Sequence, residues 1–358
     1  MDKGIGLKLQ SLLSSGLGKE KLTPLLLSCG MASDAHAILP MIKCEDLKIH
    51  YGDHVAVDSL SFEVTSGSVY GLIGPNGAGK TTTIKAIATL IEPTYGEILV
   101  DHIPVLHQPE EARKIIGYMP DFPPVYDELR VEEFCDLFAH AYGLESGARA
   151  RKVEECLRLT DLLDKRRALC KTLSRGMKQR ALLAKTLVHD PSVLLLDEPA
   201  ANLDPKARID LRNLLRRLAS SGKTVLVSSH VLTELEDLCD AIGIMNQGNM
   251  ALSGSLDEVT ASASASASQV ILLELAEPFP NLENLLSDSP SVSRVEARDE
   301  AARIFEITHP GDKSAAATLL TSLTGAGAKV CGFHLKQSKV EDLFLEIEAK
   351  GTSKETGL

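Results

Sequence analysis

A glycine-rich segment between an apolar run and an amphipathic run constrains the fold more than any other feature of the chain. Residues 74–81 read Gly-Pro-Asn-Gly-Ala-Gly-Lys-Thr and match the pattern G-x-x-x-x-G-K-[ST]. The largely apolar residues 68–73 before it predict a buried strand. Apolar residues at i, i+3, i+4 and i+7 from Ile84 to Ile91 predict one face of a helix after it. A strand, a glycine turn and a helix in this order are typical of a phosphate-binding loop.

The residues of this segment have distinct expected roles. The glycines let successive backbone N–H groups turn toward phosphate oxygens, and the start of the helix adds partial positive charge. Lys80 is expected to reach the outer phosphates of a nucleotide, and the Thr81 hydroxyl to bind Mg²⁺. The predicted nucleotide-binding residues here are Gly74, Pro75, Asn76, Gly77, Ala78, Gly79, Lys80, Thr81 and Thr82.

A second chemical signal follows the apolar run Val193–Leu196. Asp197 and Glu198 are expected at the carboxyl end of a strand, where ligands of open α/β folds bind. Asp197 is suited to hold Mg²⁺, and Glu198 to act as general base toward an attacking water. Such a pair is mostly structural on its own, but the phosphate-binding loop earlier in the chain favours the catalytic interpretation.

Several motifs in order resemble those of the ATP-binding subunits of ABC (ATP-binding cassette) transporters, over about Met41 to Val259. Leu173–Arg180 resembles the family signature L-S-G-G-Q, and Ala201–Asp204 the loop after the catalytic strand. His230, after two serines, resembles the switch histidine of the family, and Tyr51 the aromatic residue that stacks on adenine.

The resemblance implies MgATP hydrolysis by two such subunits in a head-to-tail dimer with ATP between them. It implies that Ser174 and Gly176 of one subunit contact the γ-phosphate bound by the other, and that His230 orients the water. Ser174 is also expected to cap a helix that begins near Arg175, which leaves N–H groups directed at an anion. The predicted catalytic residues are Glu198, His230 and Lys80.

Two places depart from the family pattern. The usual Gln after Gly-Tyr-x-Pro is Asp121, a carboxylate that can still bind Mg²⁺ or water but adds negative charge near the phosphates. In the signature, Arg175 replaces the first Gly and Met177 the Gln, while Ser174 and Gly176 remain. The predicted metal ligands are Thr81, Asp197 and Asp121, and activity is expected to be retained.

The order of predicted elements indicates an α/β P-loop ATPase domain with a mixed sheet and a helical insertion, then a small α+β domain. Residues 42–49 alternate as in an edge strand, 193–196 and 224–228 predict buried strands, and 131–142 and 151–159 predict helices. The Ala-Ser repeat at 261–268 predicts a linker. Beyond it, a β-α-β-β-α-β order is typical of ferredoxin-like domains. Its elements are expected at 270–275, 281–286, 292–297, 303–308, 313–323 and 329–335, with a closing helix at 340–348.

These patterns give expected domain boundaries. Residues 1–40, in which Gly4, Gly6, Gly16 and Gly18 interrupt any helix, are expected to be a disordered extension, a non-native product of a mis-assigned start before Met41, or a short membrane-surface helix. The remaining expected parts are an ATPase domain at 41–260 with a helical subdomain at about 122–190, a linker at 261–269, a ferredoxin-like domain at 270–348 and a tail at 349–358.

Composition limits the kinds of partner and the cellular compartment that are expected for this chain. A net charge of −11 argues against general nucleic-acid binding, and basic clusters such as Lys165–Arg167 lack interleaved aromatic residues. The seven cysteines show no C-x-x-C spacing, which indicates isolated thiols in a reducing compartment. No stretch of about 20 apolar residues is present, so a membrane permease is expected as a separate chain. The expected location is the cytoplasmic face of the cell membrane, with contact through the helical insertion and residues 121–126.

Two other functions are open alternatives. A soluble ABC ATPase without a permease, acting in assembly or translation, would share the same motifs. The translation type carries two cassettes in one chain, whereas this chain has one phosphate-binding loop. A degenerate, non-hydrolysing cassette is disfavoured because Lys80, Asp197, Glu198 and His230 are all present.

Overall fold

The computed structural model describes most of the chain between Pro40 and Lys336. The described residues form two compact units, one from residues 40–70 and 81–228 and the other from residues 71–80 and 229–336. The interpretations of residues 1–40 and the closing helix at 340–348 concern residues outside this part, Pro40 excepted, and stay predictions. The described ranges are 40–121, 125–201, 203–235, 237–259, 269–280, 282–287, 292–298, 303–309 and 313–336.

The first unit contains a four-stranded antiparallel sheet. Its strand order is β2 (His54–Thr65), β1 (Pro40–Tyr51), β4 (Tyr95–Val100) and β5 (Ile103–Pro104). Strand β1 pairs with both β2 and β4, so the expected edge strand at 42–49 is wrong: the strand is internal. Alternation of apolar residues reports which face of a strand is buried, and says nothing about how many of its edges are paired.

A six-stranded sheet has the order β10 (Asn249–Ser255), β9 (Ala241–Asn246), β3 (Val69–Ile73), β8 (Thr224–Ser229), β7 (Val193–Leu196) and β6 (Ile116–Met119). The pairs β6–β7 and β7–β8 are parallel. Every residue of β3, β7 and β8 is buried, as is usual for parallel strands covered on both faces. The strands expected at 68–73, 193–196 and 224–228 are thereby confirmed.

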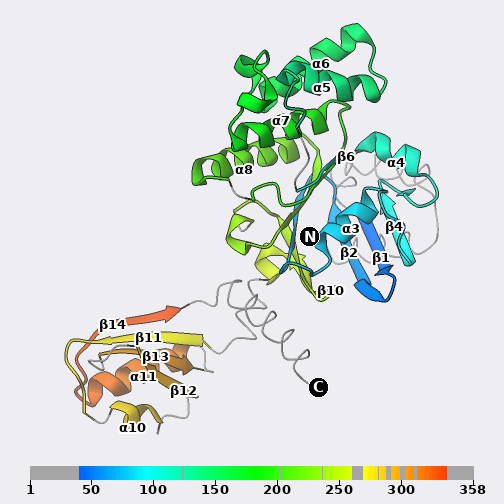
Figure 1. Cartoon of the computed structure of the whole chain (residues 1–358). Coiled ribbons are helices and arrows are strands. Elements are labelled where there is room, and N and C mark those ends of the chain that lie inside the picture. Colours follow the sequence, from blue (N-terminus) through cyan, green and yellow to red (C-terminus); the bar gives the residue numbers. More distant parts are fainter. Residues whose placement is uncertain are drawn as a thin grey trace, which may run out of the picture. The chain divides into compact units, whose positions relative to one another are not determined.

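The helices beside these sheets include α3 (Lys80–Ile87), α4 (Pro109–Ile115), α5 (Val131–Ala141), α6 (Ser146–Leu159), α7 (Arg175–Leu187) and α8 (Pro205–Ser220). Helices α5, α6 and α7 pack against one another at the top of Figure 1. The helices expected at 131–142 and 151–159 are confirmed, although α6 begins earlier, at Ser146. Helix α3 ends before the expected Ile91, because Thr89 adopts a left-handed φ of 61°.

The C-terminal part of the second unit forms its own antiparallel sheet, in the order β12 (Arg294–Ala297), β13 (Ile304–His309), β11 (Gln269–Leu275) and β14 (Val330–Lys336). Helices α10 (Leu282–Ser287) and α11 (Lys313–Gly325) accompany this sheet in the part of the chain that the structure describes. The predicted element order is confirmed. Strand β13 lies between β11 and β12 and splits a β-α-β unit, as in ferredoxin-like domains. Its core includes Ile271, Leu273, Phe305, Ile307 and Leu319.

Two general expectations can be compared with the described residues. None of the helices in the ranges given above is both long enough and apolar enough to span a bilayer. Six cysteines lie in these ranges and all are free thiols; only Cys331 among the six is exposed. Burial raises the pKa of the Cys156 thiol to about 12, which makes it a poor nucleophile.

Candidate nucleotide-binding site

The glycine loop follows directly from the buried strand β3. The Gly74 N–H donates to the Ser229 carbonyl at 3.3 Å. A Cβ atom on Gly74 would collide with the carbonyl oxygen of Met245, so only glycine fits this approach. Gly79 has a φ of +100°, a conformation that side-chain-bearing residues rarely adopt. The sequence therefore needs glycine at both positions to form the loop.

Lys80 is the first residue of α3 and is only 5% exposed. Its Nζ donates to the carbonyl oxygens of Gly74 at 2.6 Å and Pro75 at 3.1 Å. The loop thus curves around a buried ammonium group beside a helix N-terminus, where the first N–H groups have no helical acceptor. Positive charge and the N–H groups at the start of a helix together suit a phosphate.

Asp197, at the end of β7, is joined to two hydroxyl groups in the first unit. The Thr81 Oγ1 donates to Asp197 Oδ1 at 3.0 Å, and the Ser228 Oγ donates to the same oxygen at 2.7 Å. Asp197 is 1% exposed, and its own N–H donates to the Met119 carbonyl at 2.9 Å. The structure thereby brings together Thr81 and Asp197, two of the three residues predicted to bind Mg²⁺.

Glu198 occupies an unusual backbone conformation beside this cluster. Its N–H donates to the Ser228 Oγ at 2.9 Å, and its φ is +48°. A non-glycine residue in the left-handed region is strained, and such strain concentrates at functional sites. Ser228 was not predicted as a site residue, although it begins the Ser-Ser-His motif. It holds both Asp197 and the backbone of Glu198.

Tyr118, on β6, lies within electrostatic reach of two predicted metal ligands. Burial raises its pKa to about 12, and the negative charges of Asp197 and Asp121 add to the shift. Its hydroxyl is buried without a hydrogen-bond partner among the described residues. Sequence reasoning missed Tyr118, whose only signal was the Gly-Tyr-x-Pro pattern. Two carboxylates near one buried phenol make a region of negative charge that a cation would stabilise.

The donor set around Asp197 suits Mg²⁺. Thr81 and Asp197 offer hydroxyl and carboxylate oxygens, the ligands that Mg²⁺ prefers, and the usual site shares the ion with substrate phosphates. Within the ranges the structure describes, no three His, Cys, Asp or Glu side chains are grouped to hold a metal by themselves.

The remaining predicted residues lie on other elements. Ser174 precedes α7, and its Oγ accepts the Met177 N–H at 3.3 Å, so the predicted helix cap is confirmed. Gly176 lies in the first turn of that helix, which contains no acidic residue. His230 is exposed directly after β8, and Tyr51 is 49% exposed at the end of β1.

A glycine loop that opens into a helix, and a buried Asp-Glu pair at the end of a parallel strand, define a P-loop nucleotide-binding domain of the α/β class. A family model described as ABC transporter matches residues 57–201. The Nod factor export ATP-binding protein I of Cupriavidus metallidurans is 33% identical over 316 residues, which cover 88% of this chain and 98% of that protein.

Two solved structures extend the comparison to three dimensions. One, an ATP-binding subunit of an ABC transporter, is 32% identical with a TM-score of 0.57, over 62% of this chain and 92% of that one. The other, a dimeric bacterial ABC transporter cassette, is 26% identical with a TM-score of 0.55, over 60% of this chain and 99% of that one. The chain belongs to the family of ABC transporter ATP-binding proteins. It is the ATP-binding and ATP-hydrolysing subunit of such a transporter.

Proposed function

We propose that this chain hydrolyses MgATP with Glu198 as the general base, and that hydrolysis drives a separate membrane permease in an export reaction. The observation that carries the catalytic assignment is the hydrogen-bonded cluster of Thr81, Asp197 and Ser228. Its hydrogen bonds, all made within the chain itself, fix the Asp197 carboxylate and the backbone of Glu198. Preorganised groups of this kind lower the barrier because they need no rearrangement during the reaction.

The other site residues take complementary roles. Lys80, already directed into the glycine loop, supplies positive charge to the outer phosphates, and His230 donates a hydrogen bond that orients the attacking water. Thr81 and Asp197 would hold Mg²⁺, and Asp121 would contribute a third oxygen, from its carboxylate, or bind a water of the ion. The metal would neutralise charge on the transferring phosphoryl group. Tyr51 offers an exposed ring on which adenine stacks.

The signature residues act on a second copy of the chain. Ser174 and Gly176 begin a helix whose first turn has no acidic residue, so its N–H groups and dipole are suited to an anion. We infer a head-to-tail dimer in which this turn meets the phosphates bound by the partner. The likeness to a dimeric bacterial ABC transporter cassette supports this arrangement.

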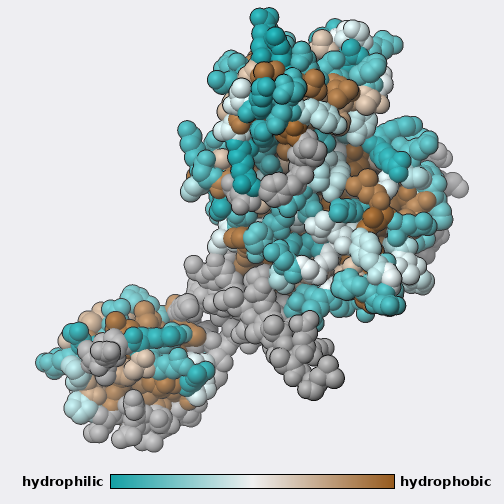
Figure 2. All heavy atoms as spheres, viewed as in Figure 1, coloured by the Kyte–Doolittle hydropathy of each residue, from teal (hydrophilic) through white to brown (hydrophobic). Residues whose placement is uncertain are grey.

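A pocket between α5 and α6 is the surface proposed to meet the permease. This helical pocket, of about 740 Å³, has apolar walls from Leu129, Leu137, Val153 and Leu157. Leu137 of α5 is 45% exposed. Tyr126, which precedes α5 and is 48% exposed, packs edge-on against Phe134 of α5. Figure 2 shows apolar residues exposed between hydrophilic ones over this helical region.

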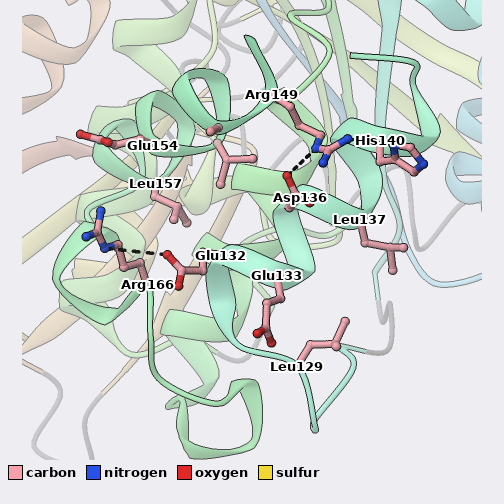
Figure 3. Close-up of a pocket in the computed structure, with 12 residues that line it drawn as sticks. Leu129, Glu132, Glu133, Asp136, Leu137, His140, Arg149, Glu154, Leu157 and Arg166 are labelled. Carbon is pink, nitrogen blue, oxygen red and sulfur yellow. Dashed lines mark hydrogen bonds and ion pairs between the residues drawn. The ribbon is translucent and has the colours of Figure 1, made fainter. Parts of the chain in front are cut away.

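Charged side chains surround the helical pocket and stabilise its rim. Figure 3 shows Arg149 of α6 facing Asp136 of α5, with the ion pair at 2.6 Å, and Arg166 facing Glu132 at 3.8 Å. An apolar floor with a satisfied polar rim is the usual anatomy of a protein-binding surface. A short amphipathic helix from a cytoplasmic loop of the permease fits it.

The permease proposal is tested by introducing a charged side chain among the apolar residues that line the helical pocket. Leu137→Arg should abolish co-purification of the chain with the membrane fraction and leave the ATPase activity of the isolated chain within about twofold. Leu90→Arg, at a residue 56% exposed outside the pocket, is the matched control and should co-purify normally. Membrane association that survives Leu137→Arg would contradict the proposed surface.

Export, location and domain organisation complete the proposal. The relative from Cupriavidus metallidurans is named for Nod factor export, which supports export as the direction, with the chain at the cytoplasmic face of the cell membrane. We further propose an ATPase domain at 41–260 and a separate ferredoxin-like domain at 270–348 that regulates or assists pairing of the cassettes.

A further inference from the structure

A single side chain ties helix α7 to the residue that follows the catalytic Glu198. The Nε2 of Gln179, in the second turn of α7, donates to the carbonyl oxygen of Pro199 at 2.8 Å. The carbonyl can only accept, so the amide nitrogen of Gln179 must face it. Pro199 has no N–H of its own, and this carbonyl is its only backbone group able to form a hydrogen bond.

Further contacts of α7 and α8 couple the position of α7 to the loop that starts at Glu198. Arg180, next to Gln179, pairs with Asp210 of α8 at 2.6 Å, and the Arg208 Nε donates to the Leu203 carbonyl at 3.0 Å. Helices α7 and α8 therefore hold both ends of the loop that starts at Glu198. A displacement of α7 is transmitted to that loop with little slack, because the polar contacts are short and partly buried.

We propose that Gln179 is a positioning residue, which sets the backbone of Glu198 according to the position of α7. The inference rests on the proposed function, in which the first turn of α7 meets the phosphates held by the partner chain. Ser174 and Gln179 lie on the same rigid helix, so contact with a partner's nucleotide at Ser174 moves Gln179 as well. Each chain then hydrolyses its own ATP efficiently only when its α7 is engaged by the other.

The backbone conformation of Glu198 explains why a small displacement of α7 would affect the position of its carboxylate. Its φ of +48° is sparsely populated, so the turn persists only where neighbours on both sides determine it. Ser228 holds the N–H of Glu198 on one side, and Gln179 holds the carbonyl of the next residue on the other. Loss of either anchor lets the carboxylate move away from the water that it activates.

The test compares two substitutions with a matched control. Gln179→Glu keeps the shape of the side chain but replaces the donor with a carboxylate, and Gln179→Ala removes it. Both should lower kcat about 10-fold, with the KM for ATP within about twofold and the Tm nearly unchanged. Lys171→Ala, which removes only an exposed ion pair with Glu128, should behave as the unaltered chain. Unchanged kcat in both Gln179 variants would overturn the proposal.

A double-mutant cycle separates positioning from a merely structural role. If Gln179 acts through Glu198, adding Gln179→Glu to Glu198→Gln should cost nothing further, so the double variant equals the single Glu198→Gln variant. A further 10-fold loss in the double variant would overturn the proposal. Wild-type turnover in Glu198→Gln alone would instead remove the role proposed for Glu198, which is a distinct failure.

Discussion

Asp197 is 1% exposed and has two hydroxyl groups within hydrogen-bonding distance, whereas the first turn of α7 is open to solvent at Ser174. The carboxylate of Asp197 accepts hydrogen bonds from the Thr81 and Ser228 hydroxyls of its own chain. The turn at Ser174 satisfies one N–H with its own cap and carries positive dipole potential with no acidic residue to balance it. The cluster around Asp197 is therefore fully formed within a single chain, whereas the first turn of α7 is suited to bind an anion that another chain holds.

The two regions differ in what each can do within a single chain. Preorganisation around Asp197 explains how one chain binds nucleotide, and in the proposed function it would also hold the metal. The uncompensated turn explains why hydrolysis should need two chains. Substitutions in the two regions should therefore have different effects: those near Asp197 should affect chemistry or folding, and those in the first turn of α7 should affect dimerisation.

The largest effect is expected at the general base. Glu198→Gln should lower ATP hydrolysis by about 10²-fold or more, the scale of a lost general base, while ATP binding persists. Because the signature turn is untouched, dimers should accumulate in ATP and Mg²⁺. Turnover assays and size-exclusion chromatography measure both effects. Rapid turnover in this variant would remove Glu198 from the mechanism.

A somewhat smaller effect is expected from the hydroxyl that orients Asp197. Ser228→Ala removes the donor to Asp197 and the acceptor of the Glu198 N–H, so activity should fall about 10- to 100-fold. The free energy of unfolding should also fall by about 1–3 kcal/mol, because a buried carboxylate loses a donor. Denaturant titration checks this second effect. Unchanged ATPase activity and an unchanged free energy of unfolding in Ser228→Ala would contradict the preorganisation of this region.

The signature turn should respond in the opposite sense. A methyl group on Gly176 would meet Ala207 at 3.4 Å, ordinary contact, so packing does not require glycine there. Gly176→Ala should raise the free energy of unfolding by up to about 0.5–1 kcal/mol through higher helix propensity. It should nevertheless weaken ATP-dependent dimerisation several-fold, because the methyl group keeps phosphate away from the backbone. A variant that is both less stable and fully dimeric would contradict the comparison.

The smallest effect is expected at Asp121. Asp121→Gln should leave hydrolysis intact and lower the pKa of Tyr118 from about 12, because one of the negative charges that raise it is lost. In the unsubstituted chain the contribution of Tyr118 to stability is present below about pH 10 and declines between about pH 10 and 12, since only the unfolded chain releases the proton there. Spectroscopic titration of tyrosine measures the shift. An unchanged Tyr118 pKa would place Asp121 away from the site, whereas Asp121→Ala tests its role in coupling to the permease.

Some of this organisation could be predicted from sequence and some could not. The glycine loop, the buried strand before Asp197 and the cap at Ser174 depend on local spacing, and local spacing is what a sequence displays. The internal position of β1 depends on pairing with β4, about fifty residues later, and no local period encodes a partner at that distance. The same holds for Ser228 and Gln179, whose roles exist only once distant segments meet Asp197 and Pro199.

The central claim, that each hydrolytic site is shared between two chains, is tested by mixing two inactive variants. Lys80→Met lacks the phosphate-binding ammonium group. Gly176→Asp places a negative charge in the first turn of α7, which favours the helix and repels phosphate. In a mixed head-to-tail dimer, one of the two sites combines an intact loop with an intact signature turn. The account predicts that the mixture is more active than either variant alone but reaches at most roughly one quarter of wild-type ATPase activity, since about half of the dimers are mixed, each has one intact site, and the α7 of the hydrolysing chain is not engaged. Activity no higher than the average of the two variants would contradict it.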